Sequence, residues 1–300
     1  RSTPRATCAP ETSCSPSAPA MFGRSVKIFC AVVAAAAWRG FSMGARLSQH
    51  FLRDEGYRDG VAGLANARPG DKILEIGPGR GALTGRLLAT GAAVTAIELD
   101  EIIAGKLPGM VGPDAAKNLK TINEDFLRLD LRELGPGPWI VVGNLPYAVG
   151  TPILQKLLTW NEWNRAVLMF QLEVGERIVA KLGGADYGLL SLSVIARADA
   201  EMAFEVPRAA FMPVPKVESA VVVLTRHDPP RLAAAEEKGF WRLAKIAFSQ
   251  RRKMASGVLS KAINKPRSEV DAAFAAAGLD IAVRPEEIPF DAWRALARAL

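Results

Sequence analysis

The sequence predicts an α/β protein in which a doubly wound, mostly parallel sheet of seven strands precedes a small all-helical domain. Between residues 71 and 170, short apolar segments alternate with longer segments of helical character, an order typical of strand–helix–strand units. After the two prolines of "RHDPPR" (226–231), apolar residues recur at spacings of three and four, which is the period of amphipathic helices. The two patterns place the sheet first and the helical domain second.

Strands are predicted over 72–77, 93–100, 119–125, 139–144 and 165–171, and two more over 200–207 and 218–225. The first five have a nearly continuous content of Val, Ile and Leu, as expected for parallel strands that are covered on both faces. Helices are predicted over 82–90, after a glycine-rich turn, and over 152–158, where Pro152 suits a first-turn position. Right-handed connections between such units wind helices onto both faces of a sheet.

The chain divides into three predicted regions, at residues 1–42, 43–226 and 227–300. The first is rich in Ala, Ser and Pro and contains a single acid and an apolar run of only eleven residues (28–38). Such a run is too short to span a bilayer. We therefore expect region 1–42 to be a leader, such as a transit peptide, or a non-native extension, disordered and outside the fold.

Cysteine usage indicates a reducing compartment. All three cysteines (Cys8, Cys14 and Cys30) lie in the first region, and the chain has only two histidines. The predicted domains therefore have neither a disulfide framework nor a cysteine-based metal site, and no metal is expected. We expect a cytoplasmic monomer that does not bind membranes, or an organellar protein if region 1–42 is a true transit peptide.

The charge of the chain indicates a polyanionic partner. The formal net charge is +7. Between Arg226 and Arg267, eleven Lys or Arg residues stand against three acids. This local excess favours a nucleic-acid-binding face on the helical domain over a merely solvated helix surface.

A glycine-rich loop and an acid predict a nucleoside-containing cofactor. "LEIGPGRGALT" (74–84) places Gly77, Gly79 and Gly81 between the first strand and the next helix, where glycine lets the backbone approach a ligand closely. Glu98 ends the second strand, twenty-one residues after Gly77. A carboxylate at that place can accept hydrogen bonds from both hydroxyls of a ribose.

The third predicted strand helps to choose between cofactors. It ends in Asp125 followed by Phe126, a carboxylate for the exocyclic amine of adenine and an apolar wall for its ring, although Asp125 is also a candidate turn or N-cap residue. The acidic lining, which includes Glu75 and Glu98, suits the sulfonium of S-adenosylmethionine better than the pyrophosphate of a nicotinamide cofactor.

Six short motifs of the sequence together resemble those of a known family. "LSQHFL", "LEIGPGRGALT", "AIELD", "EDFL", "GNLPY" and "FMPVPKVESAVV" occur in the order and spacing of the ribosomal RNA adenine N6-dimethyltransferases. The resemblance runs from about residue 46 to the C-terminus and is strongest to the bacterial 16S rRNA enzymes. It implies a Rossmann-like class I methyltransferase fold and dimethylation, from S-adenosylmethionine, of two adjacent adenines near the 3′ end of 16S rRNA.

The resemblance also implies which residues form the site. It assigns cofactor binding to His50, which stands where many relatives have Asn, and to Leu52, Gly77, Gly79, Glu98, Asp125 and Asn144. An adenine N6 lone pair is delocalised into the ring, so acceptors for the amine protons should help more than a strong base. We expect Asn144 and the carbonyl of Leu145, aimed by Pro146, to be these acceptors. Tyr147 and Phe211 are expected to stack on the displaced base.

The helical domain is expected to bind the phosphates of the RNA. Arg251, Arg252 and Lys253 are consecutive, and Lys245 precedes them by about two turns. Contacts from such residues orient the RNA and weaken as salt rises. Specificity is expected to come from the folded shape of the ribosomal substrate.

Three alternatives are open from sequence. A 23S rRNA dimethyltransferase or an organellar homologue stays within the family. A non-catalytic RNA-binding assembly factor with the same fold is disfavoured by the intact Gly77, Glu98, Asp125 and Asn144. An NAD-dependent oxidoreductase has no proton donor beside "NLPY" and leaves the basic helical domain unexplained.

Overall fold

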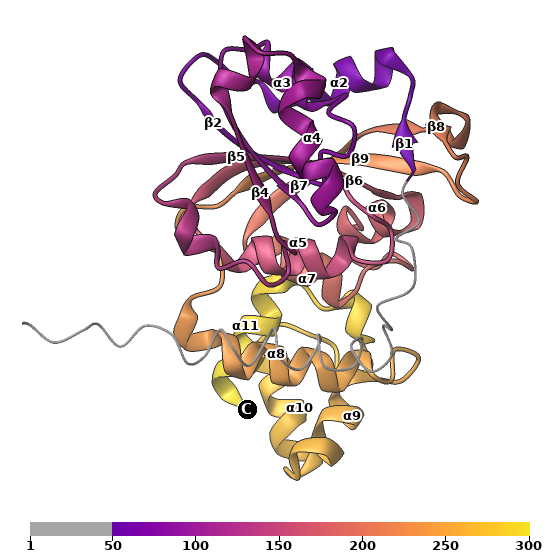
Figure 1. The fold of residues 1–300 in the computed structure, drawn as a ribbon. Coiled ribbons are helices and arrows are strands. Elements are labelled where there is room, and N and C mark those ends of the chain that lie inside the picture. The colour runs from indigo at the N-terminus through magenta and orange to yellow at the C-terminus, as the bar shows by residue number, and fades with distance from the viewer. Residues whose placement is uncertain (1–49) are drawn as a thin grey trace, which may run out of the picture.

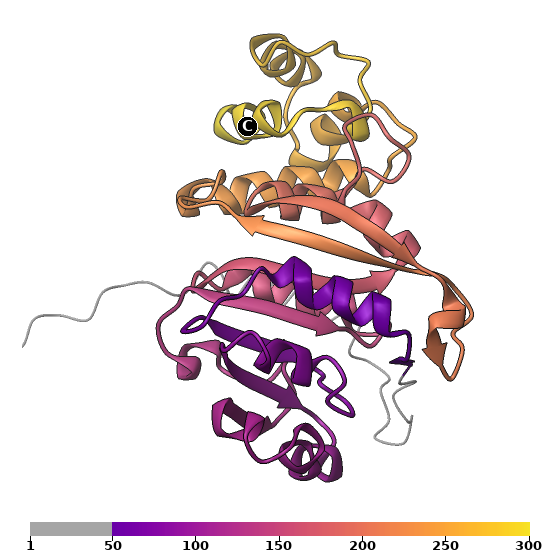
Figure 2. The same ribbon diagram turned by 90° about the horizontal axis from the view of Figure 1, so that it is seen from above.

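The computed structural model describes residues 50–300 and arranges them in layers (Figures 1 and 2). A central sheet lies between two groups of helices, and a further helical unit packs beyond one of these groups. The predicted leader, residues 1–42, lies outside the described residues. No helix within residues 50–300 is both long enough and apolar enough to cross a membrane.

The central sheet has seven strands in the order β4-β3-β2-β5-β6-β9-β7, and each matches a predicted one. Their bounds are β2 (Lys72–Ile76), β3 (Ala93–Glu98), β4 (Leu119–Asn123), β5 (Trp139–Asn144), β6 (Trp163–Gln171), β7 (Ala198–Val206) and β9 (Ser219–Arg226). The strands from β4 to β6 pair in parallel, whereas β9 is antiparallel to both of its neighbours. The mostly parallel sheet of seven strands is therefore confirmed.

The strand order reverses beside β2. The chain proceeds outward from β2 through β3 to β4, and then returns to place β5 on the other side of β2. In open α/β sheets such a switch point leaves a crevice at the carboxyl ends of the two central strands. The loops after β2 and β5, which carry the glycine and "NLPY" motifs, meet there.

Helices cover both faces of the sheet. One face is covered by α2 (Glu55–Ala65), α3 (Thr84–Leu88) and α4 (Glu101–Val111), and the other by α5 (Gly150–Thr159), α6 (Leu172–Ile178) and α7 (Leu189–Ile195) (Figure 1). The helix predicted over 82–90 is α3, which is shorter than expected at both ends. The helix predicted over 152–158 is α5.

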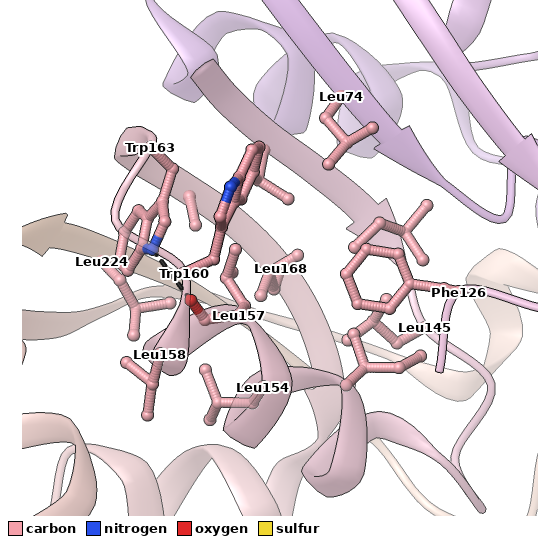
Figure 3. Close-up of a cluster of buried hydrophobic side chains, with 14 of the residues drawn as sticks. Leu74, Phe126, Leu145, Leu154, Leu157, Leu158, Trp160, Trp163, Leu168 and Leu224 are labelled. Atoms are coloured by element: carbon pink, nitrogen blue, oxygen red, sulfur yellow. Dashed lines mark hydrogen bonds between the residues drawn. The ribbon is translucent and has the colours of Figure 1, made fainter. Parts of the chain in front are cut away.

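The apolar core beneath α5 fixes this helix to the sheet (Figure 3). Leu154 and Leu157 are fully buried, and they pack among leucines of β2, β6 and β9. Trp163, at the start of β6, is 1% exposed and donates a hydrogen bond from Nε1 to the Leu157 carbonyl over 3.0 Å. These apolar contacts therefore hold α5, which follows the "NLPY" turn, against the sheet.

A second sheet was not predicted. It consists of β1 (Phe51–Leu52) and β8 (Phe211–Met212), which pair antiparallel. Strands of two residues are too short to show an alternating pattern in the sequence. The pairing ties the segment that enters the sheet domain to the loop between β7 and β9.

The helical unit contains α8 (Ala234–Phe248), α9 (Ala255–Ile263), α10 (Arg267–Ala276) and α11 (Phe290–Ala299). We propose a domain boundary at residue 226, as the sequence predicts. The core of this unit nevertheless includes Tyr187, Leu192 and Ala196, which precede the boundary. An ion pair between Arg197 and Glu237 also crosses it.

Leu192→Ala is expected to destabilise the sheet and the helical unit together. Leu192 is fully buried in the shared core, and truncating such a leucine costs about 2–5 kcal/mol. Urea unfolding followed by fluorescence and circular dichroism should show a single transition at lower urea. Leu182→Ala, at a side chain that is 49% exposed, serves as the control and should change stability by less than about 0.5 kcal/mol. Two separate transitions would contradict the shared core.

Candidate active site

A cavity of about 1050 Å³ opens at the carboxyl ends of β2, β3, β4 and β5. Its wall includes every residue that the sequence predicts for cofactor binding: His50, Leu52, Gly77, Gly79, Glu98, Asp125 and Asn144. It also includes Leu145, Pro146 and Tyr147. The fold thus brings residues from each of the six family motifs into the wall of one cavity.

The glycine loop is tied to the end of β3. Gly79 has φ 53°, and a Cβ there would lie 3.0 Å from the Phe51 ring. Its amide donates a hydrogen bond to Glu98 Oε2 over 3.2 Å, and the Asp100 amide donates to Oε1 over 3.0 Å. Glu98 is 4% exposed. Each Glu98 carboxylate oxygen can accept a further hydrogen bond, so the two oxygens can still accept from the two hydroxyls of a ribose.

The loop after β4 forms another wall. Asp125 Oδ1 accepts a hydrogen bond from the Leu127 amide over 2.9 Å, which shapes a turn, while its side chain remains part of the cavity wall. Phe126 is 5% exposed and also lines the cavity. The sequence left open whether Asp125 is a turn residue or a cavity residue, and the structure shows that it is both.

Lys156 is a residue of this region that the sequence analysis missed. It lies on α5, and its Nζ donates hydrogen bonds to the Phe126 carbonyl over 2.6 Å and to the Leu129 carbonyl. The same ammonium lies 5.3 Å from the centre of the Phe126 ring. Lys156 thus holds the Asp125 loop against the helix that follows "NLPY". A lysine within an amphipathic helix gives no sequence signal for such a bond.

The "NLPY" turn presents an amide and an aromatic ring. Asn144 donates a hydrogen bond from Nδ2 to the His50 carbonyl over 3.1 Å. No described residue donates to its Oδ1, so the orientation that this bond sets leaves the oxygen as an acceptor. The Tyr147 hydroxyl lies 2.8 Å from Ser219 Oγ, which fixes its ring. Leu145 is 2% exposed and anchors the turn in the core.

Phe211 is not part of the cavity wall. It is 2% exposed and packs in the core that α2 and α3 cover, opposite Leu52 in the β1–β8 pair. Successive side chains of a strand point to opposite faces. The next residue, Met212, is accordingly 51% exposed and lines the cavity together with Pro213. In this arrangement the predicted stacking role of Phe211 has no ring face available.

The four predicted RNA-binding residues lie at and after the end of α8, outside the cavity wall. Arg252 and Lys253 are exposed. Arg251 instead donates hydrogen bonds from Nη2 to the carbonyls of Ala185 and Tyr187, over 2.8 and 2.9 Å. Burial lowers the pKa of Lys245. The helix α8 runs toward the side of the molecule on which β1 and β8 lie (Figures 1 and 2).

Residues 40–295 match the family of ribosomal RNA adenine dimethylases. The chain belongs to this family. It is therefore an S-adenosylmethionine-dependent enzyme, and the oxidoreductase alternative is excluded.

Named relatives resemble the dimethylase over most of its length. The ribosomal RNA small subunit methyltransferase A of Phenylobacterium zucineum is 43% identical, over 84% of this chain and 86% of the relative. The protein of the same name from Desulfitobacterium hafniense is 38% identical, over 85% and 91%.

Two solved structures share the fold. The 23S rRNA methyltransferase ErmE aligns with a TM-score of 0.67 and 29% identity, over 83% of this chain and 99% of that one. A dimethyladenosine transferase from Plasmodium falciparum aligns with a TM-score of 0.72 and 24% identity, over 82% and 96%. The predicted fold class is confirmed by these matches.

A buried acid shows that the cavity of the dimethylase suits a cationic cofactor. Glu75 is 1% exposed, and no described residue donates a hydrogen bond to its Oε2. Burial raises its pKa to about 7; the nearby Thr84 hydroxyl counteracts part of this increase, and the charge of Glu98 adds to it. The sulfonium and ammonium of S-adenosylmethionine would offset the negative charge in this cavity.

Glu75→Gln is expected to stabilise the cofactor-free protein at pH 8 and to change its stability little at pH 5. The folded pKa of Glu75 is about 7, above the ordinary 4.5, so wild-type stability is lost as the pH rises between these values. A shift of this size corresponds to about 3 kcal/mol, and an amide has no charge to desolvate.

Urea unfolding of both proteins at the two pH values measures this difference. The exposed Glu176 provides the control, since Glu176→Gln should have the same small effect at both. An equal effect of Glu75→Gln at pH 5 and pH 8 would refute the interpretation.

Proposed function

We propose that the protein transfers methyl groups from S-adenosylmethionine to N6 of two adjacent adenines near the 3′ end of 16S rRNA, in the small ribosomal subunit. The observation that carries this proposal is the orientation of the Asn144 side-chain amide. Its Nδ2 donates a hydrogen bond to the His50 carbonyl over 3.1 Å, which leaves Oδ1 to accept a hydrogen bond from the target amine. The names of the relatives, which are small-subunit methyltransferases at 38–43% identity, support the choice of substrate.

The site suits a reaction in which the substrate supplies the nucleophile. The adenine N6 would attack the methyl carbon, the carbon–sulfur bond would break with its electron pair staying on sulfur, and the amine proton would pass to solvent. An acceptor at Asn144 Oδ1, with the Leu145 carbonyl as the second, turns the N6 lone pair out of conjugation and toward the methyl group. Positioning and electrostatics supply the rest of the rate, because neither a nucleophile nor a strong base is needed from the protein.

Tyr147 is proposed to stack on the adenine after the base leaves its helix. Enzymes that modify a base within a folded nucleic acid take it out of the stack and read it in a pocket. The Ser219 hydroxyl holds the ring of Tyr147 at a distance of 2.8 Å between the oxygens. The Tyr147 ring is therefore held in one orientation before a base arrives.

RNA phosphates are proposed to bind Arg252, Lys253 and Lys245. The first two side chains are exposed, whereas Lys245 is half-buried. Arg251, predicted as a fourth contact, is used within the protein, where it holds the 185–187 loop. Its proposed role is therefore to orient the other basic residues. The protein is proposed to act as a monomer.

A 23S rRNA substrate is the second candidate, and ErmE is the observation that favours it. ErmE is 29% identical to this chain, below the 38–43% of the small-subunit relatives. The small-subunit assignment is therefore preferred. An organellar location depends on residues 1–42.

The substrate is tested by incubating the protein with unmethylated small ribosomal subunits and labelled S-adenosylmethionine, and then mapping the modified bases. Two methyl groups are expected on each of two adjacent adenines near the 3′ end of 16S rRNA. Large subunits serve as the matched substrate control and should remain unlabelled. Label confined to large-subunit RNA would overturn the assignment.

Asn144→Ala is expected to lower kcat on the order of 10²–10³-fold, the loss typical for removal of one oriented polar group from a site. Calorimetry should show that S-adenosylmethionine binding weakens far less. Asn161→Ala, at an exposed residue between α5 and β6, is the control and should keep wild-type turnover. Turnover near wild type in the Asn144 variant would eliminate the proposed acceptor.

A further inference from the structure

Arg58 places a positive charge in the wall of the cofactor cavity. It lies on α2, is half-buried, and lines the cavity together with Val61, about one helical turn later. The Nε of Arg58 donates a hydrogen bond to the Leu52 carbonyl over 2.7 Å. Leu52 is itself part of the cavity wall. The bond therefore fixes one edge of the guanidinium at the border of the cavity.

The other edge of this guanidinium is available for an anion. Within residues 50–300, neither Nη1 nor Nη2 of Arg58 has a hydrogen bond or an ion pair. An arginine whose Nε is occupied still presents two parallel N–H groups from its terminal nitrogens, and this pair can bind both oxygens of one carboxylate. Arg58 therefore has the chemistry of a carboxylate-binding residue.

An ion pair holds the α2 helix next to the glycine loop. Asp59, the residue after Arg58, pairs with Arg86 of α3. The helix α3 begins at Thr84, directly after Leu83 of the cavity wall. The pair thus joins α2 to the helix that follows the glycine loop, and Arg58 lies on the side of the cavity that this loop borders.

The strand order leaves this side for the methionine tail of S-adenosylmethionine. Asp125 and Phe126, expected to receive the adenine, follow β4, and Glu98, expected to receive the ribose, ends β3. Because β4, β3 and β2 are adjacent in this order, a cofactor bound in this way would extend from the adenine through the ribose toward β2. Its methionine tail would then reach the wall that includes Leu52 and Arg58.

The carboxylate of this tail needs a positive partner, because the cavity is rich in acids. Glu75 and Glu98 are both buried in its wall. They suit the sulfonium and the ammonium of the cofactor, but their charges repel a carboxylate. The α-carboxyl group of an amino acid is ionised at neutral pH. A guanidinium beside the tail would offset this charge.

Among the described residues, three other arginines line the cavity, and each is placed differently. Arg53 is exposed. Arg80 is exposed, and its guanidinium lies 5.0 Å from the centre of an aromatic ring. Arg128 is also exposed and forms an ion pair of 3.8 Å within the loop after β4, on the side expected for adenine. Of these four arginines, Arg58 is the one that is half-buried and held through Nε.

We propose that Arg58 binds the carboxylate of the methionine tail of S-adenosylmethionine through Nη1 and Nη2. The residue is not among those that the family resemblance assigns to the cofactor. In this arrangement the acids of the cavity face the two cationic groups of the cofactor, and Arg58 faces its one anionic group. The inference concerns the cofactor alone, so it holds whichever RNA is methylated.

Two ligands that differ only in the carboxylate test this proposal. Decarboxylated S-adenosylmethionine keeps the sulfonium and the ammonium and lacks the carboxylate. Calorimetry without RNA measures the affinity of both compounds for the wild-type protein, Arg58→Met and Arg58→Gln. The Met variant keeps an apolar side chain and removes the charge, whereas the Gln variant retains an amide that can donate to the Leu52 carbonyl.

The wild-type protein is expected to bind S-adenosylmethionine about 10- to 100-fold more tightly than the decarboxylated compound, the range for a hydrogen bond between charged groups. Both Arg58 variants should lose most of this difference, because they weaken S-adenosylmethionine binding and leave the decarboxylated compound nearly unaffected. Arg165→Met is the matched control. The Nε of Arg165 also donates to a carbonyl, that of Leu64 over 2.7 Å, but Arg165 lies outside the cavity wall, so both affinities should stay unchanged.

Three results would overturn the carboxylate contact. Equal affinity of the wild-type protein for the two compounds would do so without any variant. Equal weakening of both compounds in the Arg58 variants, with thermal unfolding confirming that they are folded, would reduce Arg58 to a support of the Leu52 segment. Unchanged S-adenosylmethionine affinity with a raised KM for small subunits would make it an RNA contact instead. Failure to methylate small subunits contradicts the proposed function and leaves these binding measurements unaffected.

Discussion

The parallel pairing of β2 with both β3 and β5 is the constraint on which the site depends. It sets the ends of three strands side by side, so that the glycine loop, Glu98 and Asn144 meet although they are distant in sequence. The pairing is sustained by strands whose inner residues are buried on both faces. The leucine and tryptophan core beneath α5 holds the turn after β5 in place (Figure 3).

Much of the fold could be predicted because its signals are local. Apolar segments, most of them rich in Val, Ile and Leu, identify the strands of the central sheet, and the glycine and "NLPY" motifs identify the strand ends that form the cavity. The two-residue strands β1 and β8 carry no periodic pattern, so their pairing was missed. Phe211 was placed in the site by its motif, but the register of this pair turns its ring into the core.

Long-range polar contacts were beyond prediction for a different reason. Arg251 stands in a basic run that is typical of an RNA contact, yet its guanidinium binds two carbonyls that lie more than sixty residues away in the chain. Lys156 is an ordinary helical lysine until α5 is placed beside the Asp125 loop. In both cases the partner is a backbone carbonyl, and a carbonyl leaves no trace in the amino-acid sequence.

The core shared by α7 and the helical unit has a consequence for how RNA is handled. Since Leu192, Tyr187 and Arg251 join the two parts, we infer that the distance between the basic residues after α8 and the Asn144 amide changes little. On the proposed function, RNA phosphates bound after α8 would therefore lie at one fixed distance from the nucleotide that is methylated. Two neighbouring adenines can be modified only if the RNA advances by one nucleotide, about 3.4 Å along a stacked strand, while the exposed Arg252 and Lys253 exchange phosphates. In this arrangement the RNA moves between the two methylations, and the two parts of the enzyme keep their relative position.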